Sequence, residues 1–130
     1  MRALRDLLDE RPSVATESAL EALTWRLLLD GGLPRPERQY EIFGSGGRLL
    51  ARVDFAYPEA RVAIEADGYA FHSDPADWQR DRTRQNALTA MGWAVFRVTW
   101  ADVTRRGRAV VREIARLLAE RPILLDRIDM

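Results

Sequence analysis

The sequence predicts an α/β domain, a mixed sheet flanked by helices. Three strand-like segments follow one another over residues 39–66, leucine-rich helical patterns precede and follow them, and a fourth alternating segment covers residues 93–99. The order α-β-β-β-α-β-α is typical of a layered α/β domain. We expect a single domain over residues 1–130, with its core at about 18–120, because 130 residues suffice for one hydrophobic core.

Two helices are expected before the first strand. The first covers residues 3–10 and is interrupted by Pro12. The second covers residues 18–30, where leucines recur at helical spacing, and Gly31 and Gly32 follow it directly. This pattern places one leucine-rich face of the second helix against the sheet.

The next segments predict a hairpin and a third strand. Residues 39–43 and 49–57 form the hairpin, because both alternate between apolar and polar residues around the glycine-rich turn 44–47. A second turn at 58–60 leads to a more apolar strand at 61–66, as expected for a central strand.

The second half of the chain predicts a helix, a strand and a helix. The helix covers residues 76–91, with Asp74 as its cap, the strand covers 93–99, and the last helix covers 108–120. Three tryptophans of this half are expected to pack in the core or at its edge: Trp78, Trp93 and Trp100. The short tail at 123–130 has no clear pattern.

Composition excludes several classes of site. The chain has no cysteine, which excludes disulfides, thiolate metal sites and cysteine nucleophiles. All 20 basic residues are arginine, so any chemistry that needs a lysine must use a substitute. No apolar run is long enough to span a membrane, and the N-terminus lacks the apolar segment of a signal peptide. We therefore expect a cytoplasmic protein without membrane partners.

Charge is unevenly spread although the net charge is zero. Residues 80–116 hold nine arginines against three acids, whereas residues 1–79 hold nine arginines against fourteen acids. An acidic half and a basic half suit a site that binds a metal on one side and phosphate on the other. The structural alternative is that helix faces in solvent are simply charged.

Two carboxylates occupy otherwise apolar strands. Asp54 lies in the second strand of the hairpin and Glu65 in the third strand. A buried carboxylate needs a cation or hydrogen-bond donors, and neighbouring strands can bring two carboxylates to one Mg²⁺ or Mn²⁺. The structural alternative is a pair of salt bridges to nearby arginines such as Arg52 or Arg61.

Other candidates surround this pair. Asp67 can add a metal oxygen, although Asp-Gly is also a common turn pair. His72, the single histidine, can move protons near neutral pH, although a lone histidine is often incidental. Glu21 can point to the metal site, or it can complete a capping box with Ser18 at the start of a helix.

Arginines open the helix that follows these acids. Arg82 and Arg84 are candidates for binding substrate phosphate, because a guanidinium matches the geometry of phosphate. The structural alternative is an ordinary solvated helix face in which Asp81 pairs with a neighbouring arginine.

Five short motifs together resemble a known superfamily. They are S-x-L-E, V-D-F, E-x-D-G-x-x-x-H, D-R-x-R and G-W-x-V-x-R, at Ser18–Glu21, Val53–Phe55, Glu65–His72, Asp81–Arg84 and Gly92–Arg97. In order and spacing they resemble the PD-(D/E)XK nucleases, in particular small bacterial endonuclease-domain proteins related to the very short patch repair branch.

The resemblance implies a restriction-endonuclease-like αβββαβ core and a role for each acid. It makes Asp54 the motif aspartate, Glu65 the acid of the third motif, Glu21 the acid of the first helix and His72 a proton-transfer residue. The superfamily lysine would fall at Asp67, and the zinc-site cysteines of the repair enzymes are absent. Thymine–guanine mismatch repair is therefore not implied.

These observations lead to two functional hypotheses. The first is a Mg²⁺- or Mn²⁺-dependent nuclease, in particular a DNA endonuclease, with metal ligands at Asp54, Glu65 and Asp67. The second is a nucleic-acid-binding or regulatory module on the same fold without turnover, motivated by the absent lysine. A separate DNA-reading domain or partner fits either hypothesis, and the sequence leaves the oligomeric state open.

Overall fold

The structure is a computed structural model that describes residues 14–67 and 74–121. Its elements in chain order are α2 (Val14–Asp30), β1 (Glu37–Phe43), η1 (Ser45–Gly47), β2 (Leu49–Tyr57), β3 (Val62–Ala66), α3 (Pro75–Ala90), β4 (Ala94–Val98), α4 (Trp100–Arg105) and α5 (Gly107–Glu120). The helix expected at 3–10 and the tail at 123–130 lie outside the described residues. No helix among the described residues is long and apolar enough to cross a membrane.

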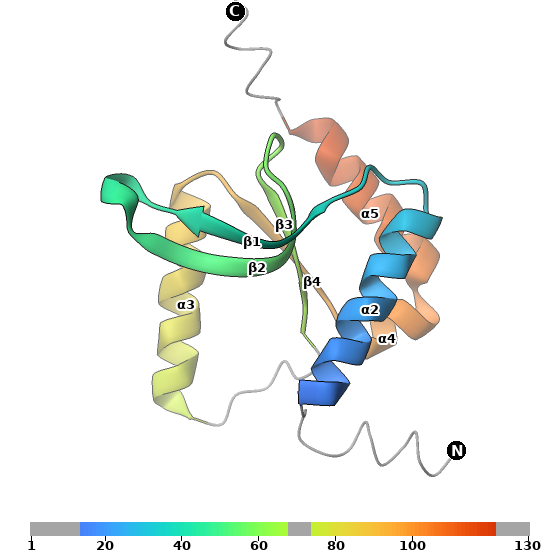
Figure 1. The fold of residues 1–130 in the computed structure, drawn as a ribbon, viewed down its shortest axis with the longest axis horizontal. Coiled ribbons are helices and arrows are strands. Elements are labelled where there is room, and N and C mark those ends of the chain that lie inside the picture. The colour runs from blue at the N-terminus through green and yellow to red at the C-terminus, as the bar shows by residue number, and fades with distance from the viewer. Residues whose placement is uncertain (1–13, 68–73, 122–130) are drawn as a thin grey trace, which may run out of the picture.

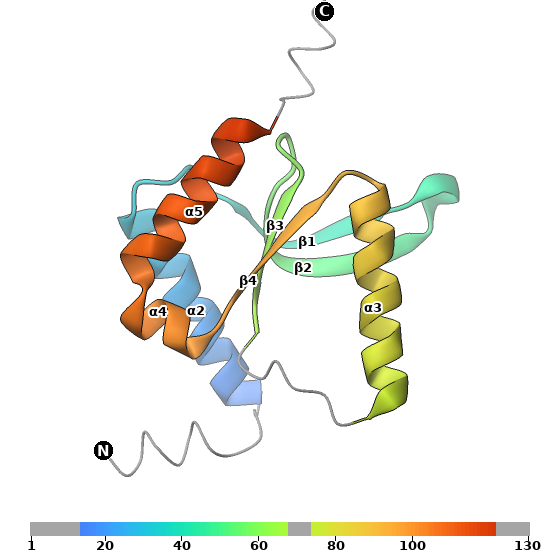
Figure 2. The same cartoon turned by 180° about the vertical axis from the view of Figure 1, so that it is seen from behind.

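The four strands form one mixed sheet between two helical layers. The strand order is β1-β2-β3-β4; the β1–β2 and β2–β3 pairs are antiparallel, and the β3–β4 pair is parallel. Helix α3 lies on one side of the sheet, and α2, α4 and α5 lie together on the other (Figures 1 and 2). This arrangement confirms the predicted α/β class and contains the αβββαβ order.

The larger core lies between the sheet and the layer of α2, α4 and α5. Phe55 and Ile64, which are paired across β2 and β3, are fully buried there with Leu28 of α2 and Ile114 of α5. Burial of each such side chain contributes roughly 1.5–3 kcal/mol. A Cβ atom at Gly31 would lie 2.7 Å from a methyl of Val111, so glycine is what lets α2 and α5 approach here.

The face of the sheet under α3 is only partly apolar. Leu88 is the buried residue of α3, and it packs in a cluster that includes Ala56, Ala63 and Trp93. The preceding turns of α3 contact the sheet through polar side chains, including Asp81 and Gln85, which hydrogen-bond to β4. The polar half of this face is where the candidate site lies.

Most element boundaries agree with the prediction to within two residues, but two features differ. Helix α2 begins at Val14, one turn before the expected start, so Ser18 lies inside the helix and its capping box with Glu21 is wrong. Helix α4 was not expected. It begins with a capping box between Thr99 and Asp102, a pattern visible in the sequence.

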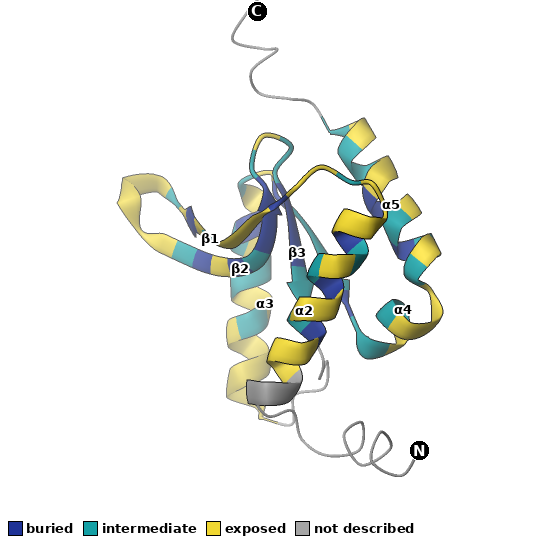
Figure 3. Ribbon diagram, turned by 45° about the vertical axis from the view of Figure 1, so that its right-hand side comes forward, coloured by how far each residue is buried: buried dark blue, intermediate teal, exposed yellow. Residues whose placement is uncertain are grey.

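Among the described residues, large apolar side chains are exposed on α2, on the β1–β2 hairpin and on α3; they are Leu23, Leu29, Phe43, Leu49 and Trp78. Phe43 is 50% exposed at the end of the β1–β2 hairpin, where the ribbon projects from the body of the domain (Figure 3). Trp78 is 51% exposed on α3, so of the two positions expected for it, in the core or at its edge, the first is wrong. Trp93, in contrast, is buried as expected.

Candidate functional site

Asp54 lies on β2, the strand between β1 and β3. Continuing the β2–β3 register by one pair places it opposite Glu65, on the same face of the sheet as Ala56 and Ala63. Its Oδ2 accepts a hydrogen bond of 2.8 Å from the backbone N–H of Ala66. The predicted meeting of two carboxylates from adjacent strands therefore has a structural basis in the sheet register.

No positively charged side chain among the described residues pairs with Asp54. Burial raises the pKa of Asp54, and the charges of Glu21 and Glu65 raise it further; the hydrogen bonds from Ala66 and Gln39 oppose the shift without cancelling it. Asp54 makes no ion pair with any described residue, so the structural alternative of a salt bridge is wrong for this carboxylate. Glu65 does pair with an arginine, but with Arg84 and not with Arg52 or Arg61. An added cation would therefore stabilise the ionised form of this carboxylate.

Gln39 connects Asp54 with the first helix, a role that the sequence analysis did not assign. Its side-chain amide donates to Oε2 of Glu21 at 2.8 Å and, more weakly, to Oδ1 of Asp54 at 3.4 Å. Gln39 has a φ of 48°, in the left-handed region that residues other than glycine rarely adopt. Backbone strain of this kind is common where a side chain is held for function.

Glu65 is held by an arginine from α3. Arg84 donates from both terminal nitrogens to the two carboxylate oxygens of Glu65, at 3.2 Å and 2.8 Å. This forked geometry is the strong form of the carboxylate–arginine pair. Arg84 therefore lies in the site, bound to an acid; its contact with substrate phosphate remains a prediction.

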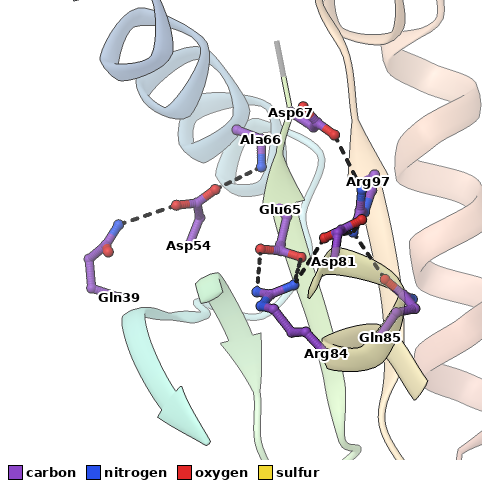
Figure 4. A network of polar contacts seen from close by, with 9 residues as sticks. All are labelled: Gln39, Asp54, Glu65, Ala66, Asp67, Asp81, Arg84, Gln85 and Arg97. Atoms are coloured by element: carbon purple, nitrogen blue, oxygen red, sulfur yellow. Dashed lines mark hydrogen bonds and ion pairs between the residues drawn. The ribbon is translucent and has the colours of Figure 1, made fainter. Parts of the chain in front are cut away.

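Arg97 of β4 joins three groups on the far side of Glu65. It makes an ion pair of 3.4 Å with Asp67 and of 3.0 Å with Asp81, and it donates to Gln85 at 3.0 Å. Burial alone would raise the pKa of Asp81, but hydrogen bonds and charge from Arg97, with the charges of Arg84 and Arg82, outweigh it and lower the pKa. Figure 4 shows these contacts beside Asp54.

These groups line a hollow of about 300 Å³ at the end of β3. Its lining residues are Glu17, Asp54, Glu65, Ala66, Asp67, Asp81, Arg84 and Arg97. Five carboxylates therefore face two guanidinium groups, a formal excess of three negative charges if every acid is ionised. Such an excess favours a cationic ligand, because like charges confined together stabilise any opposite charge that enters.

Two of the other predicted site residues are described by the structure, and neither of them lines the hollow. Glu21 is tied to Asp54 through Gln39, so it belongs to the same cluster without lining the hollow. Arg82 does not line the hollow; its guanidinium lies over the ring of Trp78, 5.4 Å from the ring centroid. His72 lies outside the described residues.

The donor set fits a hard divalent cation at Asp54 and Glu65. Mg²⁺ prefers oxygen ligands, keeps several waters, and is often held by one or two carboxylates. Within the described residues, no three acidic or histidine side chains are grouped closely enough to hold a metal ion by themselves. The fit therefore rests on two carboxylates, and a cation at Glu65 would compete with Arg84.

Comparison with known proteins identifies one matching family. The family model REase_MTES_1575, a restriction-endonuclease-like family, matches residues 37–118. The matched region includes Asp54, Glu65 and the arginines of α3 and β4, and it leaves out Glu21. No solved structure is a significant match.

Two curated relatives are similar over most of the chain. They are "Uncharacterized protein MT2308" and "Uncharacterized protein Rv2248" of Mycobacterium tuberculosis, strains CDC 1551 / Oshkosh and H37Rv, each 40% identical over 116 residues. The match covers 89% of this chain and 42% of each relative, so the chain spans less than half of their length. None of these comparisons places the chain in the very short patch repair branch. Because the family model covers more than half of the sequence, the chain belongs to the restriction-endonuclease-like REase_MTES_1575 family.

Proposed function

We propose that this domain is a metal-dependent nuclease that hydrolyses phosphodiester bonds in DNA. The observation that carries the proposal is Asp54: a partly buried carboxylate with a raised pKa, beside Glu65 and without a cationic partner among the described residues. A restriction-endonuclease-like family indicates a nuclease and a nucleic acid substrate. Metal dependence, DNA as the substrate and the roles of single residues are our additions.

The chain's own residues would divide the work as follows. Asp54 and Glu65 would hold Mg²⁺ or Mn²⁺, with Asp67 as a further oxygen donor nearby. When bound, such a cation supplies Lewis-acid chemistry, which polarises the phosphate and favours deprotonation of a water. Glu21 would keep Asp54 in place through Gln39, as their hydrogen bonds indicate.

Charge on the phosphate would be offset by arginine. Arg84 already points into the hollow, and a cation at Glu65 would release it to bind a phosphate oxygen. Preorganised donors of this kind stabilise charge that develops in the transition state. Arg82 would bind the strand outside the hollow, and His72 would transfer the proton.

The test is cleavage of plasmid and single-stranded DNA in Mg²⁺ by the unsubstituted chain and by Asp54→Ala and Glu65→Ala. We expect each substitution to lower the rate by at least about 100-fold, since loss of a metal ligand removes several kcal/mol of transition-state stabilisation. Arg106→Gln, which removes a half-exposed arginine paired with Asp102 and Glu113 elsewhere on the domain, is the matched control and should cleave normally. Equal cleavage by all four proteins would refute the assignment.

The alternative is a nucleic-acid-binding or regulatory module that does not cut. The ion pair between Arg84 and Glu65 favours it, because the carboxylate already has a cation. The same assay separates the two functions. Binding that weakens with salt, without cleavage in Mg²⁺ or Mn²⁺, would support the module. An additional DNA-reading domain, as the greater length of the relatives allows, remains a proposal for either function.

A further inference from the structure

Helix α3, which supplies Asp81 and Arg84 to the hollow, also carries an exposed tryptophan with an arginine over its ring. Trp78 lies in the first turns of α3 and is 51% exposed, which is unusual for the largest apolar side chain. The guanidinium of Arg82 lies 5.4 Å from the centroid of its indole ring, within cation–π range. Trp78 belongs to neither of the two hydrophobic core clusters.

The position of the pair relates it to the site. Trp78 precedes Asp81 by three residues on α3, and side chains at this spacing have Cβ atoms roughly 5–6 Å apart. Asp81 lines the hollow, and Arg84 follows it on the same helix. The exposed indole is therefore one helical turn from Asp81, one of the carboxylates that line the hollow.

We propose that Trp78 and Arg82 form a stacking platform for an unpaired nucleobase of the strand whose backbone enters the hollow. Indole and guanidinium planes both stack on base faces, without regard to base identity. In an intact duplex these faces are covered by neighbouring base pairs. The inference rests on the proposed nuclease function and deepens it: the substrate class is single-stranded or locally unpaired nucleic acid.

The test measures binding without divalent cations, so that cleavage plays no part. Fluorescein-labelled oligothymidylate, an abasic strand of the same length and a duplex would be titrated with the full chain in EDTA. The abasic strand keeps the phosphates and lacks the bases, so it separates stacking from charge. We expect oligothymidylate to bind more tightly than either of the other probes.

Substitutions then assign the difference to Trp78. Trp78→Ala should weaken oligothymidylate binding about tenfold, since stacking contributes roughly 1–3 kcal/mol per base. It should leave the affinity for the abasic strand unchanged. Trp78→Phe should retain most of the affinity. Phe43→Ala removes a similarly exposed aromatic side chain from the hairpin end and should leave the affinity for oligothymidylate unchanged. A thermal melt of each variant checks that the fold is intact.

Two outcomes would overturn the platform: unchanged oligothymidylate binding by Trp78→Ala, or an equal loss of affinity for the abasic strand. Either outcome leaves the cleavage test at Asp54 and Glu65 standing. Conversely, a loss confined to the base-bearing strand supports the platform even when Mg²⁺ produces no cleavage. The two proposals therefore fail separately.

Discussion

The pKa values of two aspartates on opposite sides of the hollow are shifted in opposite directions. On one side, Asp54 has only hydrogen-bond donors and two neighbouring carboxylates, and its pKa is raised, first by burial. On the other side, Asp81 is paired with Arg97, and its pKa is lowered although burial opposes this. The fold neutralises one side with its own arginines and leaves the other side in need of a cation.

This difference also shows how a site can be built without lysine. Arg84 and Arg97 place fixed positive charge beside Glu65, Asp67 and Asp81. Arginine stays protonated in proteins, so these residues can orient groups and balance charge but cannot take up a proton. Proton transfer then depends on another group, for which His72 is the predicted candidate.

The largest effect is expected when the guanidinium of Arg97 is removed from the side of the hollow where the acids are paired with arginines. Arg97→Gln leaves Asp67 and Asp81 without their shared partner. We expect the free energy of unfolding, measured by urea denaturation, to fall by about 2 kcal/mol. This is less than the roughly 3–5 kcal/mol of a fully buried pair, because 28% of the Arg97 side chain is exposed.

Two further variants control this experiment. Arg97→Lys keeps the charge but not the fork, so it should recover only part of the loss. Arg106→Gln removes the ion pairs of a half-exposed guanidinium with Asp102 and Glu113 and should cost no more than about 1 kcal/mol. If the Arg97 and Arg106 variants lost the same stability, the arginine side of the hollow would be no more than an ordinary charged surface.

A smaller effect distinguishes the two aspartates by the sign of their pH dependence. The pKa of Asp54 is raised from 3.8, so its ionisation destabilises the fold as pH rises above that value. The pKa of Asp81 is lowered from 3.8, so its ionised form stabilises the fold, and this contribution is lost as pH falls through the folded-state pKa.

Thermal melts at several pH values test these signs in metal-free buffer. At neutral pH, Asp54→Asn should raise the Tm by a few degrees, whereas Asp81→Asn should lower it. Both differences should shrink in acid below about pH 4, where the unfolded carboxylates become protonated. A lower Tm for Asp54→Asn at neutral pH would mean that its carboxylate already has a cationic partner in the protein.

Much of this site was predictable because a strand presents alternate residues to one face. Acids in apolar strands marked Asp54 and Glu65, and the sheet register brings them together on the α3 face. Along β4, Phe96 and Val98 face the larger core and Arg97 faces the opposite side, as the alternation in the sequence predicted. Local periodicity carries this information.

The partners of these acids were not predictable in the same way. Arg84 and Arg97 reach the site from different elements, and only the packing of α3 on β4 decides which acid each one meets. Gln39 is polar in a polar edge strand, and its unusual φ gave no signal in the sequence. Helix α4, in contrast, could have been predicted from the capping-box pattern of Thr99 and Asp102.

The central claim is that Asp54 and Glu65 hold a divalent cation, and calorimetric titration with Mn²⁺ tests it most directly. We expect the unsubstituted chain to bind Mn²⁺, Asp54→Asn to bind it at least about tenfold more weakly, and Asp81→Asn to bind it nearly unchanged. Arg84→Gln should tighten binding several-fold, because it frees Glu65 from its competing guanidinium. Mn²⁺ affinity that is the same in the unsubstituted chain and in Asp54→Asn would contradict the account.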